Sequence, residues 1–233
     1  MSVHDALTYL PRTGLQEFKK GNLVYDATRP SDHLYLVLAG RVKISRTASD
    51  GTRTLLRIAC AEDFFGETSL VPSGRGTGNS AVALELTQVM TWTGDRIAEQ
   101  IEREPKLALA LIEYFGRCNE VHRERIRAAA GYRTGMRLAV ALAELAESAG
   151  SRTADGTFRV CGLTHQTIGE YVGTTREIVT VEMNRLRRLG LVDYSRRQID
   201  VNCRALRDWM HAQGAAGASA QAASSGTTMQ AGG

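Results

Sequence analysis

The sequence lacks the features of membrane-embedded and secreted chains. It contains no run of apolar residues long enough to span a bilayer and no N-terminal signal-peptide pattern. Its four cysteines are scattered through the 233 residues, with no CxxC pair and no metal-ligand spacing: Cys60, Cys118, Cys161 and Cys203. We therefore expect a cytoplasmic globular protein with free thiols, no metal site and no membrane partner.

Groupings of catalytic side chains are also missing. The five histidines are dispersed, and Glu67 has no His or nucleophile partner in the sequence around it. No glycine-rich loop leads into a helix as a phosphate-binding loop would. We therefore expect that the protein is not an enzyme, and we assign no catalytic residue.

The positive charge is small but unevenly distributed. The net charge is +4, and none of the four lysines lies beyond Lys106. Between Gly173 and Arg207 there are eight arginines and four acidic residues, a local surplus of four positive charges. The planar guanidinium suits bidentate contacts with phosphate and guanine, although a solvated basic face would have the same composition.

The stretch from Leu163 to Leu191 has the pattern of two helices joined by a tight turn. Thr164 precedes a short segment in which Ile168 and Val172 recur at i and i+4, and Gly173 then supplies the turn. In the second helix, Thr174 and Glu177 have the spacing of a capping box. The packing face of this second helix is expected to carry Val179, Met183 and Leu186.

This order is typical of a helix-turn-helix, in which the second helix enters the major groove of DNA. Any two-helix corner would share the spacing, but Arg176 and Glu177 suit guanine and cytosine edges, respectively. After Gly190, a short hairpin with two central arginines predicts a basic wing for phosphate contacts. The expected DNA-binding residues are Thr164, Gln166, Thr174, Thr175, Arg176, Glu177, Thr180, Val181, Asn184, Arg196 and Arg197.

The first hundred residues alternate with a period of two. Short apolar strands separated by turn residues are expected near residues 34–38, 42–44, 54–59, 82–86 and 89–92. Such a series favours an antiparallel sandwich, jelly roll or barrel.

From Pro105 the period becomes helical and remains so for more than six turns. Apolar residues recur at alternate spacings of four and three, which predicts a helix that pairs with a copy of itself. The alternative is a helix packed on its own domain. The predicted dimer seam consists of Leu107, Leu111, Tyr114, Cys118, Val121 and Arg125. A two-fold dimer would present two reading helices to a palindromic DNA site.

The order of these parts resembles the Crp/Fnr family of bacterial transcription regulators over roughly residues 18–210. The segment LTHQTIGEYVGTTREIVT carries the most specific match, and HLYLVLAGRVKI and DFFGETSLV resemble two pieces of the family's ligand-binding roll. The resemblance implies an α+β fold: an N-terminal antiparallel β-roll (jelly roll) over residues 1–104, a dimerisation helix over 105–133 and a winged helix-turn-helix over 134–212. Residues 213–233 are small and polar and are expected to form a disordered tail.

The effector site departs from the cyclic-AMP-binding members of the family. Gly66-Glu67 is present, but Asn79 stands where those members have a phosphate-binding arginine, and His122-Arg123 replaces their adenine-reading Thr-Ser. Arg75 in the preceding loop is the one alternative guanidinium. The expected effector pocket consists of Gly66, Glu67, Thr68, Asn79, Ser80, His122 and Arg123. Cyclic AMP is not the expected effector.

The cofactor-binding branches of the family also differ from this chain. The iron–sulfur branch has a cysteine cluster near the N-terminus, whereas no cysteine here precedes Cys60. Haem-binding members place Cys or His ligands within the roll, and Cys60 and His33 are isolated. We therefore expect no cofactor.

The predicted function is a homodimeric, sequence-specific DNA-binding transcription regulator that a small effector or partner switches at the junction of roll and helix. Many family members have a second base-reading arginine where this chain has Val181, so its DNA site should differ. RNA polymerase is the further partner that the resemblance implies. Two alternatives remain: constitutive DNA binding without a ligand, and a ligand-binding adaptor whose C-terminal domain docks on protein.

Overall fold

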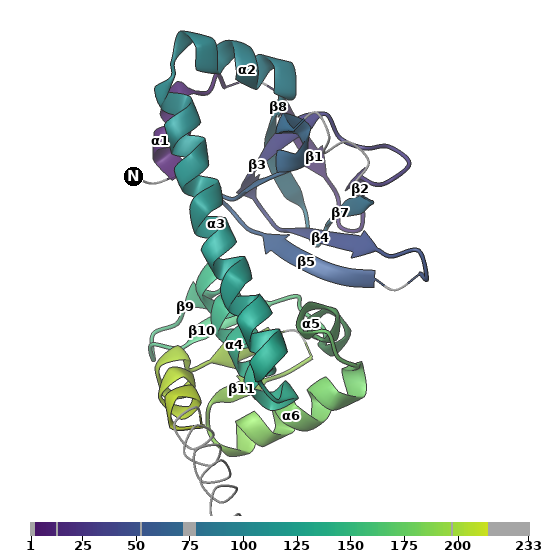
Figure 1. Ribbon diagram of the computed structural model, residues 1–233. Coiled ribbons are helices and arrows are strands. Elements are labelled where there is room, and N and C mark those ends of the chain that lie inside the picture. Colours follow the sequence, from purple (N-terminus) through teal and green to yellow (C-terminus); the bar gives the residue numbers. More distant parts are fainter. Residues whose placement is uncertain (1–2, 13, 52, 72–77, 197, 214–233) are drawn as a thin grey trace, which may run out of the picture. The chain divides into compact units, whose positions relative to one another are not determined.

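The computed structural model describes residues 3–12, 14–51, 53–71, 78–196 and 198–213. The chain divides into two compact units between Arg127 and Ala128. The first unit contains two antiparallel sheets and several helices, and the second contains helices and a small antiparallel sheet (Figure 1). The predicted α+β class, with a β-roll, a long helix and a winged helix-turn-helix, is confirmed.

The strands of the first unit pair in two four-stranded sheets, in the orders β1-β8-β3-β6 and β2-β7-β4-β5. Its elements are α1 (Val3–Tyr9), β1 (Leu15–Phe18), β2 (Leu23–Tyr25), β3 (His33–Ala39), β4 (Val42–Thr47), β5 (Arg53–Ala59), β6 (Phe64–Phe65), η1 (Glu67–Leu70), β7 (Asn79–Ala83), β8 (Thr87–Thr93), α2 (Gly94–Arg103) and α3 (Lys106–Gly131).

Strand β3 is buried on both faces, which explains its unbroken apolar sequence. Leu34 and Leu36 pack with Trp92 and helix α3 in one cluster. Tyr35 and Val37, which point the other way, pack in a second cluster between the sheets. The β-roll therefore has an inner core and a separate core beneath its helices.

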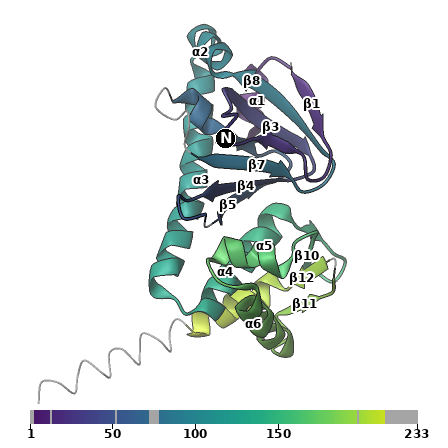
Figure 2. The same cartoon turned by 90° about the vertical axis from the view of Figure 1, so that its right-hand side faces the viewer.

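The second unit contains α4, the helix-turn-helix and a four-stranded sheet of order β11-β12-β10-β9 (Figure 2). Its elements are α4 (Thr134–Ala149), β9 (Ser151–Arg152), β10 (Phe158–Cys161), α5 (His165–Val172), α6 (Arg176–Arg188), β11 (Val192–Tyr194) and β12 (Gln198–Val201). Residues 203–213 form a closing helix, so Gln213 is helical; the rest of the predicted tail lies outside the described residues. No helix in the described ranges is long and apolar enough to cross a membrane.

The prediction that Leu107, Leu111 and Tyr114 of α3 form part of a dimer seam is wrong. Leu107, Leu111 and Tyr114 are buried in the core of the first unit. Cys118 is half-buried beside them, and the Arg125 guanidinium donates to the carbonyl oxygens of Leu55 and Leu56 in β5. Of the six predicted seam residues, Val121 is the one that is mainly exposed. The heptad spacing identifies residues that share a face, but here that face covers the chain's own β-roll.

A different face of α3 is exposed. Leu109, Ile112 and Ile126 have exposed fractions of 63%, 68% and 68%. They fall on a series with alternate spacings of three and four, completed by Gly116, Asn119 and Arg123. This exposed face, residues 109, 112, 116, 119, 123 and 126, is called the outer α3 face below.

Substitution of Leu111 tests which face of α3 belongs to the core. We expect Leu111→Ala to lower the free energy of unfolding by about 2–5 kcal/mol, because it leaves a cavity in a close-packed cluster. Leu86→Ala, at a side chain that is 58% exposed, should change it by about 0.5 kcal/mol or less. Chemical denaturation measures both changes, and equal effects would contradict the burial of Leu111.

Candidate nucleic-acid interface and effector pocket

Helices α5 and α6 are joined by a turn that glycine makes possible. The Thr164 side chain caps α5 by accepting from the Thr167 amide, as predicted. Gly173 ends α5 in the left-handed conformation, with φ 73°. A Cβ atom at Gly169 would lie 2.8 Å from the Thr174 carbonyl oxygen, so glycine there allows the turn to close against α5.

The predicted cap of α6 is displaced by one residue. Thr175 is the N-cap, and its hydroxyl accepts from the Ile178 amide at 3.4 Å. The Thr174 amide instead donates to the Gly169 carbonyl and completes the end of α5. Glu177 is therefore the second residue of α6 and does not form a capping box with Thr174. Its pKa is lowered by a backbone amide and by the Thr175 hydroxyl, so the carboxylate stays charged near neutral pH.

The two faces of α6 match the sequence prediction. Val179, Met183 and Leu186 are buried. On the opposite side, Arg176, Glu177 and Asn184 are exposed, and Val181 has an exposed fraction of 64%.

The remaining predicted DNA-binding residues lie around this face. Gln166 is exposed at the start of α5, where its amide donates to Glu170. Arg196 is exposed in the turn between β11 and β12, and Arg197 lies outside the described residues. Thr180 is half-buried, and its hydroxyl donates to the Arg176 carbonyl, so it is less available than the sequence implied.

The sequence analysis missed His165, which braces α5 against α6. Its Nδ1 atom lies 2.9 Å from the Thr180 hydroxyl. Because that hydroxyl donates its hydrogen to the Arg176 carbonyl, Nδ1 must be the donor to Thr180. Burial and the charge of Arg176 lower the pKa of His165 below its ordinary value. One indication of this contact was present in the sequence, the position of His165 directly after the cap residue Thr164.

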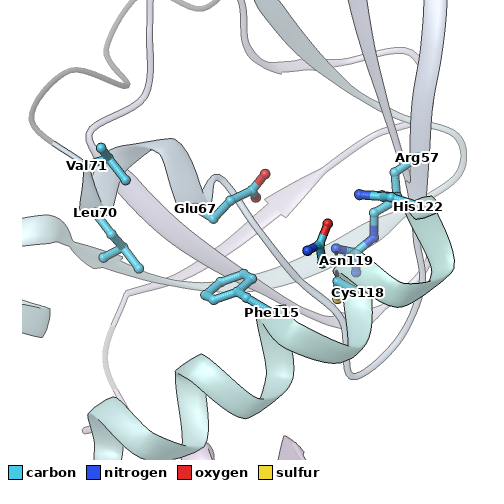
Figure 3. A pocket seen from close by; sticks show the side chains of 8 residues that line it. All are labelled: Arg57, Glu67, Leu70, Val71, Phe115, Cys118, Asn119 and His122. Carbon is cyan, nitrogen blue, oxygen red and sulfur yellow. Dashed lines mark hydrogen bonds between the residues drawn. The ribbon is translucent and has the colours of Figure 1, made fainter. Parts of the chain in front are cut away.

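The first unit contains a pocket of about 380 Å³ between η1, β5 and the inner side of α3 (Figure 3). Its lining residues are Arg57, Glu67, Leu70, Val71, Phe115, Cys118, Asn119 and His122. The pocket brings together Glu67 and His122, as predicted. The other six were not predicted: Arg57 comes from β5, Leu70 and Val71 from the end of η1, and Phe115, Cys118 and Asn119 from α3, where Cys118 had been assigned to the dimer seam.

The cationic group of the pocket is already paired. The Arg57 guanidinium lies 2.9 Å from an Asp63 oxygen and donates to the Tyr114 hydroxyl at 2.8 Å. Burial, together with the charges of Arg125 and Arg57, lowers the pKa of His122 and favours the neutral imidazole. Figure 3 shows the Glu67 carboxylate directed into the space between η1 and α3. A ligand would therefore meet a carboxylate, an amide, an imidazole and an apolar wall.

Five predicted pocket residues are not among the lining residues. Gly66 and Thr68 flank Glu67, and Gly66 requires glycine because a Cβ atom there would lie 2.6 Å from the His33 carbonyl. The Ser80 hydroxyl bonds that of Ser45 in the sheet. The two others are Asn79, whose buried side-chain oxygen has no partner among the described residues, and Arg123, which pairs with Glu120. Arg75 lies outside the described residues.

No disulfide bond is formed by the four cysteines, Cys60, Cys118, Cys161 and Cys203, all of which lie in the described ranges. Among the described residues, no three His, Cys, Asp or Glu side chains come together in a way that would hold a metal ion.

The β-roll with its pocket and the exposed face of α6 define a class of protein: a winged helix-turn-helix regulator with an N-terminal ligand-binding-type domain. Comparison with protein families supports both halves. Residues 15–104 match the cyclic nucleotide-binding domain. Residues 136–209 match the Crp-like helix-turn-helix domain.

Individual relatives identify the family. The chain is 31% identical over 166 residues to the CRP-like cAMP-activated global transcriptional regulator of Mycobacterium tuberculosis, covering 70% of this chain and 72% of the relative. It is 26% identical to the global nitrogen regulator of Synechococcus elongatus, covering 80% and 85% of the two chains. The chain belongs to the Crp/Fnr family of transcription regulators.

Solved structures show the same fold. FixK2 from Bradyrhizobium japonicum matches with a TM-score of 0.73 at 21% identity, over 85% of this chain and 97% of that one. A CRP/FNR-family regulator from Thermus thermophilus matches with a TM-score of 0.69 at 24% identity, over 84% and 98%.

The lowered pKa of His165 makes stability depend on pH. The unfolded chain binds this proton more readily than the folded chain, so the free energy of unfolding should fall as the pH drops below the ordinary histidine value of about 6.5. His165→Gln should reduce this dependence, because the glutamine amide can still donate to Thr180 but does not titrate. Denaturation at about pH 7.5 and 5.5 measures the effect.

His211→Gln, at an exposed residue of the closing helix, is the matched control and should retain the wild-type dependence on pH. An equal pH dependence in wild type and His165→Gln would contradict the assignment.

Proposed function

We propose that the protein is a homodimeric, sequence-specific DNA-binding transcription regulator that reads DNA with α6. The exposed polar face of α6 carries this proposal, since its opposite face is buried against α5 and the sheet. Arg176 lies at the N-terminal end of that face, which is the end that enters the major groove in helix-turn-helix proteins.

The side chains of α6 suggest the base contacts. Arg176 can donate two hydrogen bonds to guanine, and the charged Glu177 can accept from cytosine. Val181 cannot donate a hydrogen bond but can contact a thymine methyl group. We therefore expect a half-site that retains one arginine-read guanine and has no arginine readout at the position of Val181.

The outer α3 face is the proposed dimer interface. Leu109, Ile112 and Ile126 are largely exposed and have heptad spacing, and burial of such a stripe against a second copy is favourable. The resulting two-fold symmetry would present two α6 helices to a palindromic site.

The pocket in the first unit is the proposed effector site. Its guanidinium, Arg57, is already paired with Asp63 and Tyr114. The name of the mycobacterial relative includes cAMP activation, but the pairing of Arg57 and the presence of Asn79 in place of a phosphate-binding arginine argue that cyclic AMP is not the effector here. A different small ligand or a partner would shift the population of DNA-binding conformations.

We propose one role for each segment: residues 1–104 bind the effector, residues 105–133 form the dimer, and residues 134–212 bind DNA. We propose that the protein acts in the cytoplasm, where its partners are double-stranded DNA and RNA polymerase. DNA binding without any ligand is the second candidate, because Arg57, the guanidinium among the residues that line the pocket, is already paired with Asp63.

Selection from a random DNA pool, with and without a panel of nucleotides, tests the proposal. The full chain should enrich one palindrome with half-sites about one duplex turn apart. Enrichment that is independent of every nucleotide supports a non-nucleotide effector or constitutive binding. No enriched sequence under any condition contradicts the proposal and favours docking on protein.

Removal of the Arg176 guanidinium should affect one base pair. Arg176→Ala should cost about 1–3 kcal/mol on the selected site and much less on a site with that guanine replaced. Arg185→Ala removes one positive charge from another side of α6 and should weaken binding to both sites equally. Fluorescence anisotropy measures the six affinities of wild type and the two variants for the two sites. An equal loss on both sites for Arg176→Ala would make Arg176 a phosphate contact only.

Charge placed on the outer α3 face should dissociate the dimer. Ile112→Glu would put two carboxylates into the interface, so we expect a monomer in analytical ultracentrifugation and weaker binding to the palindrome. Leu15→Glu is the matched control, because Leu15 in β1 has a similar exposed fraction of 67%. A dimer that tolerates Ile112→Glu would rule out this interface.

A further inference from the structure

Tyr194, at the end of strand β11, contacts side chains from both helices of the helix-turn-helix. Its ring makes an edge contact with His165 of α5, with centroids 5.2 Å apart. The Arg187 guanidinium of α6 lies 5.3 Å from the same ring centroid. The Tyr194 hydroxyl donates to Oδ1 of Asn184 at 2.9 Å. Tyr194 thus links the wing to both helices of the helix-turn-helix.

The position of the tyrosine ring is fixed without its hydroxyl. Arg187 is held over the ring by an ion pair with Asp193 at 2.8 Å. His165 is held by its hydrogen bond to Thr180. Tyr194 itself pairs with Ile199 in the adjacent strand. Replacement by phenylalanine would therefore leave the wing in place and remove only the bond to Asn184.

That bond determines what Asn184 can offer to DNA. The amide oxygen accepts from the Tyr194 hydroxyl, which turns it toward the wing and leaves the two N–H donors of the exposed side chain facing outward. Asparagine recognises adenine by donating to N7 and accepting from N6 at the same time. An asparagine whose oxygen is turned inward cannot make that pair, but it can donate to guanine N7 and O6 or to thymine O4.

We propose that Tyr194 is a positioning residue for base specificity: it orients the Asn184 amide so that α6 reads a hydrogen-bond acceptor and disfavours adenine at that position. This inference rests on the proposed reading of DNA by α6. It assigns to the wing a role in base readout beyond phosphate contact.

The test compares the sequences that five full-length proteins select from one random DNA pool: wild type, Tyr194→Phe, Asn184→Ala, the double variant Asn184→Ala/Tyr194→Phe, and Tyr171→Phe. Asn184→Ala identifies the base pair that Asn184 faces, as the position that loses its preference. Tyr171→Phe is the matched control, because the Tyr171 hydroxyl donates to Glu144 elsewhere in the second unit. Unfolding midpoints check that each variant is folded.

In wild type, adenine should be disfavoured at the Asn184 position. In Tyr194→Phe the released amide can rotate and use both its oxygen and its nitrogen, so the ratio of adenine to guanine there should rise at least about fivefold. The rest of the motif should not change, and Tyr171→Phe should select the wild-type motif. In the Asn184→Ala background, Tyr194→Phe should have no further effect on base preference.

Three results would overturn the inference. The first is that wild type enriches a motif and Tyr194→Phe selects the same motif. The second is an equal loss of affinity for all sequences, which would make the hydroxyl a phosphate contact. The third is an effect of Tyr194→Phe that persists without Asn184. If wild type enriches no sequence at all, the proposed function itself fails, and this inference fails with it.

Discussion

The hydroxyl of Tyr114 fastens helix α3 to the β-roll, and the arrangement of the first unit depends on it. It accepts from the Arg57 guanidinium and from the Phe64 amide, and it donates to Asp63. The partly buried Arg57–Asp63 pair thus gains a further hydrogen-bond partner, which matters because an ion pair removed from water is costly when its hydrogen bonds are unmet. One side of α3 packs on the core and lines the pocket, and the outer α3 face is exposed; Asn119 lies at the boundary, because it belongs to this face and also lines the pocket.

The same attachment connects the pocket to the helix. Arg57 lines the pocket and is bonded to Tyr114, while Phe115, Asn119 and His122 line it from α3 itself. In the proposed function, a ligand that displaced these contacts would alter the packing of α3 on the roll. Since α3 continues beyond Arg127 into the second unit, this helix is the covalent connection through which we propose that a ligand acts on DNA binding.

Local signals made the helix-turn-helix predictable, because its caps, its glycine turn and its packing face all lie within a few residues of one another. Even there, the cap fell on Thr175 because the Thr174 amide is used by the end of α5. Several individual strands of the β-roll were also predictable from their period of two, but the order in which they pair was not.

Contacts between distant segments could not be predicted in the same way. The heptad pattern placed Leu107 and Leu111 on one face, but it could not distinguish a second copy from the chain's own roll as the covering surface. Arg57 and Phe115 enter the pocket from segments almost sixty residues apart. The bond between Tyr194 and Asn184 likewise depends on how the wing folds back onto α6.

The central claim is that α6 reads a particular DNA sequence. Its most direct test is competition between the selected palindrome and random DNA of equal length for the full chain, at about 150 mM salt, where sequence-independent binding to phosphates is weak. The account predicts a preference of about a thousandfold or more for the palindrome. Equal affinity for the two DNAs at every salt concentration would contradict it.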